Sequence, residues 1–219
     1  MPGEPTPELN PDKTIGYRLA AGLVAVLSWL VFHPRVTGRE HIPESGPVII
    51  APIHRSNLDF AFTLFISRRK VFFMSKDSLF RVPVLGRALR HLGAFPVRRG
   101  SADRESTQLA EAVLRRGYPL VLFPEGTRKE GLTVGPLHDG AMFVAARTGA
   151  RVVPVGIGGT ERAMPKGSRI PRPARVRIVI GPALEPPRSD GRVSRTQIAE
   201  KSEELRAALE SAYRSSMGL

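Results

Sequence analysis

Apolar residues gather in one continuous stretch near the N-terminus and then in short runs along the rest of the chain. The stretch is LAAGLVAVLSWLVF, residues 19–32, and it follows Lys13 and Arg18. Its 14 residues are fewer than the roughly 20 that a spanning helix needs. We therefore expect a helix that lies in the membrane interface or dips partly into it, with a buried core helix as the alternative. No A-x-A-like cleavage site follows, which argues against a removed signal peptide.

Beyond Pro34, short apolar runs alternate with segments that have a helical pattern. The runs are four to six residues long, which is typical of buried strands. We predict strands at residues 48–51, 71–74, 120–123, 152–157 and 176–180. We predict helices at residues 57–67, 82–92, 101–116, 137–148 and 194–215. The alternation predicts a single α/β domain with a central, largely buried sheet flanked by helices.

End signals accompany several of the predicted helices. Ser194 with Gln197 forms a capping-box pattern at the start of the last helix. Ser101 can cap the helix that follows it, and either Ser56 or Asn57 can cap the helix predicted from residue 57. Helix-closing glycines stand at positions 93, 117 and 149.

Length and composition fit one globular domain preceded by a short N-terminal region. The 219 residues are 42% hydrophobic and 24% charged. We expect residues 1–33 to form a flexible lead-in and an apolar membrane-associated helix, and residues 34–219 to form the domain. The absence of cysteine excludes a disulfide framework, a thiolate zinc site and a cysteine nucleophile, and it fits a reducing compartment.

The formal net charge of +13 predicts an anionic partner, which includes nucleic acid, anionic lipid headgroups and phosphorylated small molecules. Arginine dominates the 33 basic residues; genomic base composition accounts for part of this bias, but the guanidinium fork also suits phosphate. A basic nucleic-acid-binding module is the non-enzyme alternative. Aromatic residues make up only 6% of the chain, no RNA- or DNA-binding motif occurs, and the basic residues are spread out. We therefore expect no nucleic-acid partner.

The most informative motif is HRSNLD, residues 54–59, which follows a predicted strand and opens a predicted helix. Functional groups of α/β sheets gather at the C-terminal ends of strands. A histidine can take up a proton near neutral pH, and a nearby carboxylate can fix its tautomer. His54 and Asp59 are therefore candidate catalytic residues, although a histidine and an aspartate five positions apart also occur by chance.

Two further motifs contain arginine beside a glycine turn. FPEGTR, residues 123–128, follows the strand predicted at 120–123, and its turn can expose backbone N–H groups beside the fork of Arg128. GAFPVRRG, residues 93–100, places Arg98 and Arg99 after a short apolar run. Both segments are candidate phosphate-binding sites, and a structural turn or a solvated arginine pair is the alternative.

Two other enzyme classes are disfavoured. Ser56 as the nucleophile of an esterase would need His54 two residues away, which is an awkward separation, and no G-x-S-x-G motif occurs. A dinucleotide-binding motif is also absent, because Glu161 stands where the third glycine after GIGG, residues 156–159, would fall. We expect those glycines to serve a turn at the end of a strand.

Taken together, the motifs resemble the four sequence blocks of the glycerol-phosphate and lysophosphatidic-acid acyltransferase family. The blocks are His-x4-Asp, the arginine loop that begins at Gly93, FPEGTR, and VVPV at residues 152–155. The lead-in VTGREHIP, residues 36–43, is also similar, so the resemblance covers roughly residues 34–181. Four blocks in this order are far more specific than any one of them. The resemblance implies that residues 34–219 form an acyltransferase domain.

The resemblance also implies residue roles. His54 would act as the general base for the acceptor hydroxyl, and Asp59 would orient it, so that the hydroxyl attacks an acyl thioester without a covalent enzyme intermediate. Arg99, with Arg98 as the neighbouring alternative, would bind the acceptor phosphate. The third block would help to hold the acceptor through Glu125, Gly126, Thr127 and Arg128. Residues 152–155 would line the acyl-chain or donor side.

The implied reaction forms phosphatidic acid from 1-acylglycerol-3-phosphate, with acyl-CoA or acyl-ACP (acyl carrier protein) as co-substrate and with no bound cofactor or metal. Glycerol-3-phosphate, another lysophospholipid and a non-phosphorylated lipid are the alternative acceptors. The expected location is the cytoplasmic face of a membrane. Two departures from the family pattern are Ile53, where many members carry Asn, and Pro96, where many carry Phe. The second departure leaves the choice between Arg98 and Arg99 open.

Overall fold

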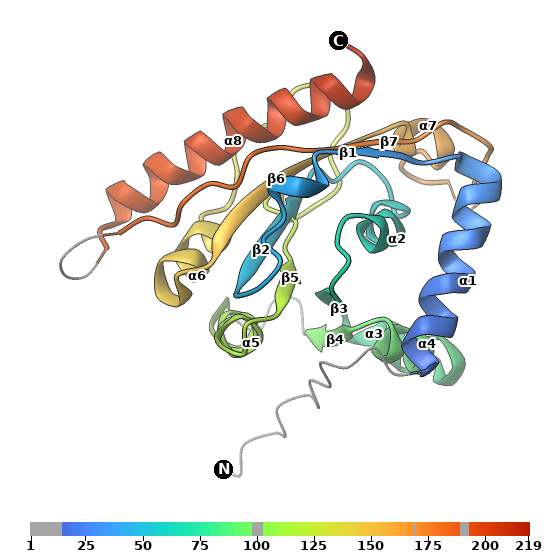
Figure 1. Ribbon diagram of the computed structural model, residues 1–219, viewed down its shortest axis with the longest axis horizontal. Helices are drawn as coiled ribbons and strands as arrows, with labels where there is room; N and C mark the ends of the chain where they lie inside the picture. Colours follow the sequence, from blue (N-terminus) through green and yellow to red (C-terminus); the bar gives the residue numbers. More distant parts are fainter. Residues whose placement is uncertain (1–14, 98–102, 169, 189–192) are drawn as a thin grey trace.

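In a computed structural model, which describes residues 15–97, 103–168, 170–188 and 193–219, a seven-stranded sheet forms the centre of the molecule (Figure 1). Its strand order is β1-β7-β6-β2-β5-β3-β4, and every neighbouring pair is parallel except β6 with β7. The strands are β1 (Arg35–Thr37), β2 (Val48–Pro52), β3 (Phe72–Lys76), β4 (Ala94–Val97), β5 (Pro119–Val121), β6 (Arg151–Gly158) and β7 (Arg177–Ile180). The predicted α/β class with a central sheet is confirmed.

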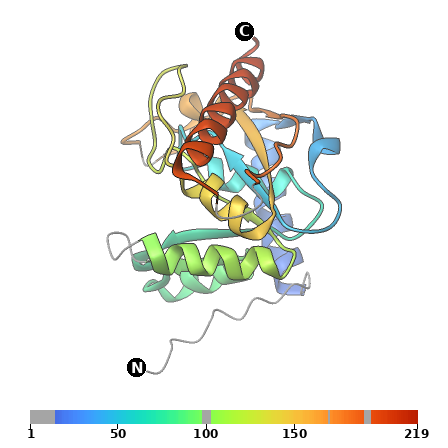
Figure 2. The same cartoon turned by 90° about the vertical axis from the view of Figure 1, so that its left-hand side faces the viewer.

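Helices cover both faces of this sheet. They are α1 (Ile15–Phe32), α2 (Asp59–Phe62), α3 (Asp77–Phe80), α4 (Pro83–His91), α5 (Asp103–Arg115), α6 (Gly140–Thr148), α7 (Thr160–Ala163) and α8 (Arg195–Met217), with 3-10 turns η1 (Arg39–His41) and η2 (Thr63–Phe65). Helices α5 and α6 lie on the side opposite to α1 and α2, and α8 runs along the far side of the sheet from α1 (Figures 1 and 2). The two layers of helices leave the sheet buried.

The alternation of side chains in β2 shows why the sheet has two cores. Val48 and Ile50 pack into one apolar cluster, while Ile49 and Ala51 pack into the other. Because successive side chains of a strand point to opposite faces, an unbroken apolar run such as VIIA is suited to a strand buried on both sides. All four of these side chains are fully buried.

Most predicted elements are present with shifted ends, and several short ones were missed. The helix predicted from residue 57 begins at Asp59 and gives way to η2, and neither Ser56 nor Asn57 is its N-cap, since Leu58 occupies that position. The strand predicted at 120–123 ends at Val121, and the helix predicted from 137 begins at Gly140. The unpredicted elements are β1, η1, α3, β4 and α7.

The end of β6 corrects the interpretation of the glycines at 156–159. Gly156 and Gly158 lie inside the strand, where a Cβ on Gly156 would come within 2.2 Å of Ala212 O in α8. Only Gly159, with φ +99°, forms the turn. Two of these glycines therefore permit close packing of α8 on β6.

The capping box of α8 is confirmed in both directions. Ser194 Oγ accepts a hydrogen bond from Gln197 N at 3.1 Å, and Gln197 Oε1 accepts one from Ser194 N at 2.9 Å. Gly117 and Gly149 have positive φ angles at the ends of their helices, as predicted, and Gly93 does so after α4. The predicted cap Ser101 lies outside the described residues.

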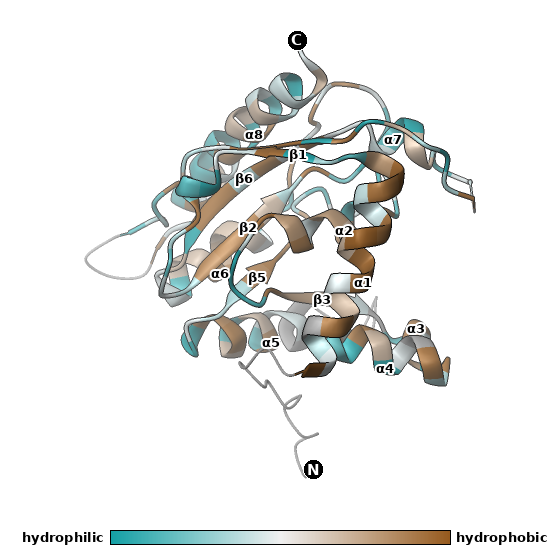
Figure 3. Cartoon of the chain, turned by 45° about the vertical axis from the view of Figure 1, so that its right-hand side comes forward, coloured by the Kyte–Doolittle hydropathy of each residue, from teal (hydrophilic) through white to brown (hydrophobic). Residues whose placement is uncertain are grey.

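Helix α1 is longer and more exposed than the apolar stretch predicted. It has 18 residues with a mean hydropathy of 1.8, and by length and composition alone it could cross a membrane. Only 18% of it is buried, so the alternative of a buried core helix does not describe it. Figure 3 shows α1 at the edge of the molecule, with most of its residues coloured as hydrophobic.

Candidate active site

The candidate site lies where β2 ends and the chain turns into α2. His54 Nδ1 and Asp59 Oδ2 are 3.0 Å apart, so the structure brings the two predicted catalytic residues into a hydrogen bond. The side chain of Asp59 is fully buried, and that of His54 is 18% exposed. The ring of His54 packs on that of Phe123, with 4.3 Å between the centroids. One edge of the imidazole is thus held, and the other is available.

Four hydrogen bonds fix the carboxylate of Asp59. Besides His54, Oδ2 accepts from the backbone N–H groups of Arg55 at 2.6 Å and Ser56 at 2.7 Å, while Oδ1 accepts from the Thr160 hydroxyl at 2.6 Å. A carboxylate that receives four donors is held in one orientation. Because the carboxylate of Asp59 acts as an acceptor, Nδ1 of His54 carries the proton in this hydrogen bond, and Nε2 is the nitrogen left to accept one.

A buried ion pair lies directly behind the histidine. Arg55 Nη1 donates to both oxygens of Glu125, at 2.7 and 2.8 Å, and Glu125 Oε2 also accepts from the backbone N–H of His54 at 2.9 Å. Each residue of the pair is 2% exposed. Arg55 further donates to the carbonyls of Gly131 and Thr133, both at 3.1 Å. The pair therefore ties the loop after β5 to the loop that carries the histidine.

The third predicted segment lies beside this pair. Gly126 has φ +66°, and a Cβ there would come within 2.7 Å of the His138 ring, so both the conformation and the space call for glycine. Gly126 and Thr127 are exposed and Arg128 is half-buried. Among the described residues, Arg128 forms no hydrogen bond or ion pair. The carboxylate of Glu125, in contrast, is fully engaged inside the protein, and substrate contacts of this segment stay a prediction.

The two other predicted phosphate ligands, Arg98 and Arg99, lie outside the described residues, which reach Val97 at the end of β4 and resume at position 103. Within the described part of the chain, no cluster of three histidine or acidic side chains could hold a metal ion.

Two members of the site were missed by sequence reasoning. Thr160 opens α7, 101 residues beyond Asp59, and carried no motif signal of its own. Arg55 stands inside the HRSNLD motif, but the motif gives no sign that this arginine is buried, because arginine is usually a surface residue. The guanidinium carbon of Arg55 lies 5.1 Å from the ring centroid of Tyr213 in α8. Burial raises the pKa of Tyr213 above its ordinary value.

The geometry of Ser56 does not suit a nucleophile. Its hydroxyl is fully buried, donates to Met164 O at 2.8 Å and accepts from Leu58 N at 3.2 Å. A nucleophilic serine would instead hydrogen-bond to its base. Ser56 thus joins the segment after α7 to the histidine loop.

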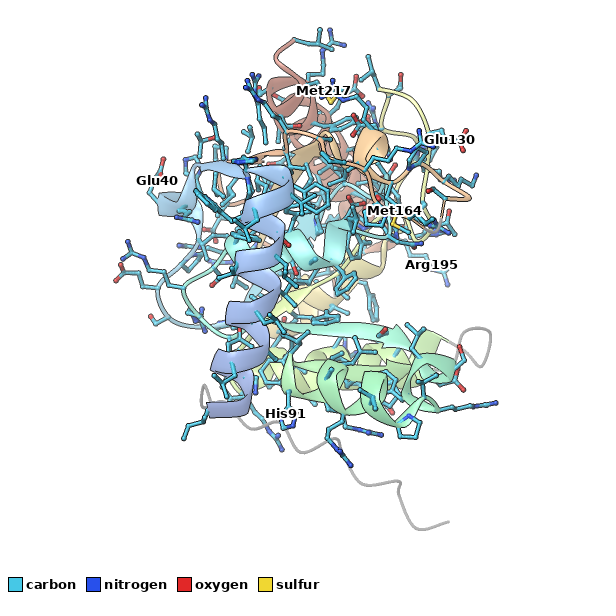
Figure 4. All side chains as sticks on the ribbon, turned by 90° about the vertical axis from the view of Figure 1, so that its right-hand side faces the viewer. Glu40, His91, Glu130, Met164, Arg195 and Met217 are labelled. Atoms are coloured by element: carbon cyan, nitrogen blue, oxygen red, sulfur yellow. The ribbon has the colours of Figure 1, made fainter. Side chains whose placement is uncertain are left out.

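The candidate site thus combines a His–Asp pair at the end of a buried parallel strand with a glycine–arginine turn beside it. The chain that carries it belongs to the acyltransferase family. The family model described as Acyltransferase matches residues 33–158, which is more than half of the chain. Figure 4 shows the side of the molecule that carries Met164, next to the histidine loop.

Individual relatives agree with this assignment. The chain is 31% identical over 198 residues to the chloroplastic 1-acyl-sn-glycerol-3-phosphate acyltransferase LPAT1 of Arabidopsis thaliana, covering 87% of this chain and 55% of the relative. It is 36% identical over 157 residues to a 1-acyl-sn-glycerol-3-phosphate acyltransferase of Chlamydomonas reinhardtii, covering 69% and 46%. The chain therefore spans about half the length of these two curated relatives.

A solved structure has the same architecture. The crystal structure of the 1-acyl-sn-glycerophosphate (LPA) acyltransferase PlsC from Thermotoga maritima superposes with a TM-score of 0.73 at 26% sequence identity. The match covers 91% of this chain and 79% of that chain.

Proposed function

We propose that this protein transfers a fatty acyl group from an acyl thioester to the free hydroxyl of 1-acylglycerol-3-phosphate, giving phosphatidic acid. The observation that carries the proposal is the hydrogen bond between His54 Nδ1 and Asp59. Three other donors hold the carboxylate of Asp59 in place, and Nε2 of the imidazole is left to act as the base. The choice of 1-acylglycerol-3-phosphate as the acceptor rests on the names of the relatives.

The reaction needs no covalent intermediate on the enzyme. His54 Nε2 takes the proton of the acceptor hydroxyl as its oxygen bonds to the thioester carbonyl carbon, and the imidazolium formed is stabilised by Asp59. The tetrahedral intermediate then expels the thiolate, which takes the proton back from His54. The product is an oxygen ester and a free thiol, so atoms and charge balance.

Arg98 and Arg99 are assigned by the resemblance alone, and the residues of the third block are assigned by the resemblance and by their place beside the histidine loop. We assign the acceptor phosphate to Arg98 or Arg99 and to Arg128, with Gly126 and Thr127 at the same turn. Glu125 acts instead as a positioning residue, because its oxygens are taken by Arg55 and by the backbone of His54. Glycerol-3-phosphate or another lysophospholipid is the alternative acceptor, and both acyl-CoA and acyl carrier protein are candidate donors.

The exposed apolar face of α1 associates the chain with a membrane. We propose that residues 1–33 serve this anchoring, that residues 34–219 carry the reaction, and that the protein works on the cytoplasmic face. A product with two acyl chains would then pass directly into lipid.

The test is an acyl-transfer assay in mild detergent or vesicles with a long-chain acyl-CoA and lysophosphatidic acid, in which both free thiol and phosphatidic acid are measured. We expect acceptor-dependent product that falls by about 10²–10⁴-fold in His54→Ala, because a general base contributes that much. His91→Ala, which removes an exposed histidine of α4, should retain parental activity. Thiol release without phosphatidic acid would indicate a thioesterase, and unchanged turnover in His54→Ala would reject the mechanism.

A further inference from the structure

The corner between α3 and α4 exposes apolar side chains outside the site. Leu79 is 41% exposed, Val82 is 52% exposed and Val84 is 79% exposed. Single exposed apolar residues are ordinary on protein surfaces, but three within six positions form a local patch. We call the segment 79–90 the α3–α4 corner.

Local packing fixes the backbone of the corner and keeps its valines exposed. Gly86 N donates to Val82 O at 2.7 Å, and a Cβ at Gly86 would come within 2.7 Å of Phe80 O, so α4 packs against α3 at backbone distance. Pro83 occupies the first turn of α4, where proline is favoured. The valines on either side of Pro83 thus stand outward in a fixed turn and do not fold back onto the core.

The same corner is basic. Arg81 and Arg87 are exposed, and Arg90 extends its guanidinium over the Phe80 ring, with 5.3 Å to the ring centroid. In the sequence from 77 to 91, Asp77 is the single acidic residue. Its contact with Arg81, at 3.3 Å, is solvent-exposed and therefore weak. Apolar side chains interspersed with arginine are typical of surfaces that meet anionic headgroups.

Helix α4, which carries most of the corner, packs against the beginning of α1. A Cβ at Gly16 would come within 3.1 Å of His91 Nδ1, so the beginning of α1 touches the end of α4. Figure 4 shows α1 and α4 on the same side of the molecule, with His91 beside the end of α1. The outer face of α1 is itself apolar, with Ile15 78% exposed and Leu19 69% exposed. A bilayer that meets the beginning of α1 therefore lies beside α4, the helix that carries most of the corner.

We propose that the α3–α4 corner is a second membrane contact, selective for anionic lipid: Val82 and Val84 insert at the interface, and Arg81 and Arg87 bind headgroup phosphates. Two contacts, α1 and the corner, would fix the orientation of the domain on the bilayer as well as its attachment. This inference concerns lipid binding and does not depend on the reaction that the site performs.

The test is a lipid titration of the full-length chain, by cosedimentation with vesicles of phosphatidylcholine alone or mixed with phosphatidylglycerol. Each arginine near an anionic surface contributes about fivefold in binding, so Arg81→Gln/Arg87→Gln should weaken binding to the mixed vesicles by roughly 25-fold and leave binding to phosphatidylcholine unchanged. Val82→Ser/Val84→Ser should weaken binding to both kinds of vesicle, on the order of tenfold.

Matched controls come from the far side of the molecule. Arg195→Gln/Arg214→Gln removes two exposed charges from α8, and Leu132→Ser/Leu219→Ser removes apolar side chains that are 44% and 65% exposed. Both controls should bind vesicles like the parent. Binding of both corner variants to vesicles at the parental level would overturn the proposal. So would a self-association of the parent, seen in sedimentation velocity without lipid, that the corner variants lose, because the corner would then be an interface between copies. Turnover in detergent tests the proposed reaction separately.

Discussion

The ion pair between Arg55 and Glu125 gives the sharpest test of how the site is built. Both side chains are fully buried, and Nη1 of Arg55 donates to the two oxygens of Glu125 at 2.7 and 2.8 Å. Removing one partner of such a pair leaves a buried charge uncompensated, which costs about 3–5 kcal/mol. We expect Arg55→Met to lower the free energy of unfolding by that amount, because Glu125 would retain only the N–H of His54 as a partner.

The reverse deletion should cost less. In Glu125→Gln the guanidinium keeps the carbonyls of His54, Gly131 and Thr133, together with the ring of Tyr213. A lost hydrogen bond between charged groups costs about 1.5–3 kcal/mol. The double variant, Arg55→Met with Glu125→Gln, buries no net charge at this point. Its loss should therefore fall short of the sum of the single losses by about 1–3 kcal/mol.

The measurement is urea unfolding of all four chains, followed by far-ultraviolet circular dichroism and analysed by linear extrapolation. Arg55→Lys serves as the milder companion, because it keeps a positive charge but loses the fork, and it covers the case in which Arg55→Met does not fold. Additive losses, within about 0.5 kcal/mol, would show that the two side chains do not stabilise each other. In that case the ion pair could not be what joins the two loops.

Three further predictions concern the rest of the molecule. Thr160→Val removes the hydroxyl that donates a hydrogen bond to Asp59 and should lower kcat roughly tenfold with KM unchanged. Thr160→Ser, which keeps a hydroxyl, should have a kcat near that of the parent, and a change in KM alone would contradict a positioning role. Ser194→Ala removes half of the capping box with Gln197 and should cost about 1 kcal/mol, seen as a Tm lowered by about 2–4 °C; an unchanged Tm would mean that the start of α8 frays without cost. Because burial raises the pKa of Tyr213, its neutral phenol should contribute its full share to the free energy of unfolding below pH about 10, and this contribution should be lost as the pH rises through the folded pKa. Tyr213→Phe should lose less free energy of unfolding over that pH range. Identical pH profiles of the two proteins would show that Tyr213 does not cause the loss.

The elements that could be predicted are those whose pattern is local. The runs at 48–51 and 152–157 form strands because an unbroken apolar run fits a strand buried on both faces, and the Ser194–Gln197 box marks a helix start through contacts only three residues apart. The short β4 was missed because it contains Pro96, which predicts an interruption. At the edge of the sheet, where β4 lies, a proline costs no ladder hydrogen bond.

The parts of the site that could not be predicted depend on distant contacts. The pair of His54 and Asp59 was visible because both residues belong to one turn. Thr160 and the partners of Arg55 come from segments 70 to 101 residues away, and no local pattern reports such contacts. Glu125 belongs to the FPEGTR motif, but its role inside the protein depends on Arg55, which lies 70 residues away in the sequence.

Strand order explains why segments so far apart in sequence meet at one histidine. The chain visits β2, then β5, then β6, but in the sheet β2 lies between the other two. The loops that leave β5 and β6 therefore emerge on opposite sides of the loop that leaves β2, where Glu125 supports the backbone of His54 from one side and Thr160 supports Asp59 from the other. Such a reversal of strand order opens a crevice at the C-terminal ends of the strands, the usual place for ligands in α/β sheets. An acceptor held at this end of the sheet would meet Nε2 of His54, the ring nitrogen that makes no hydrogen bond within the described part of the chain.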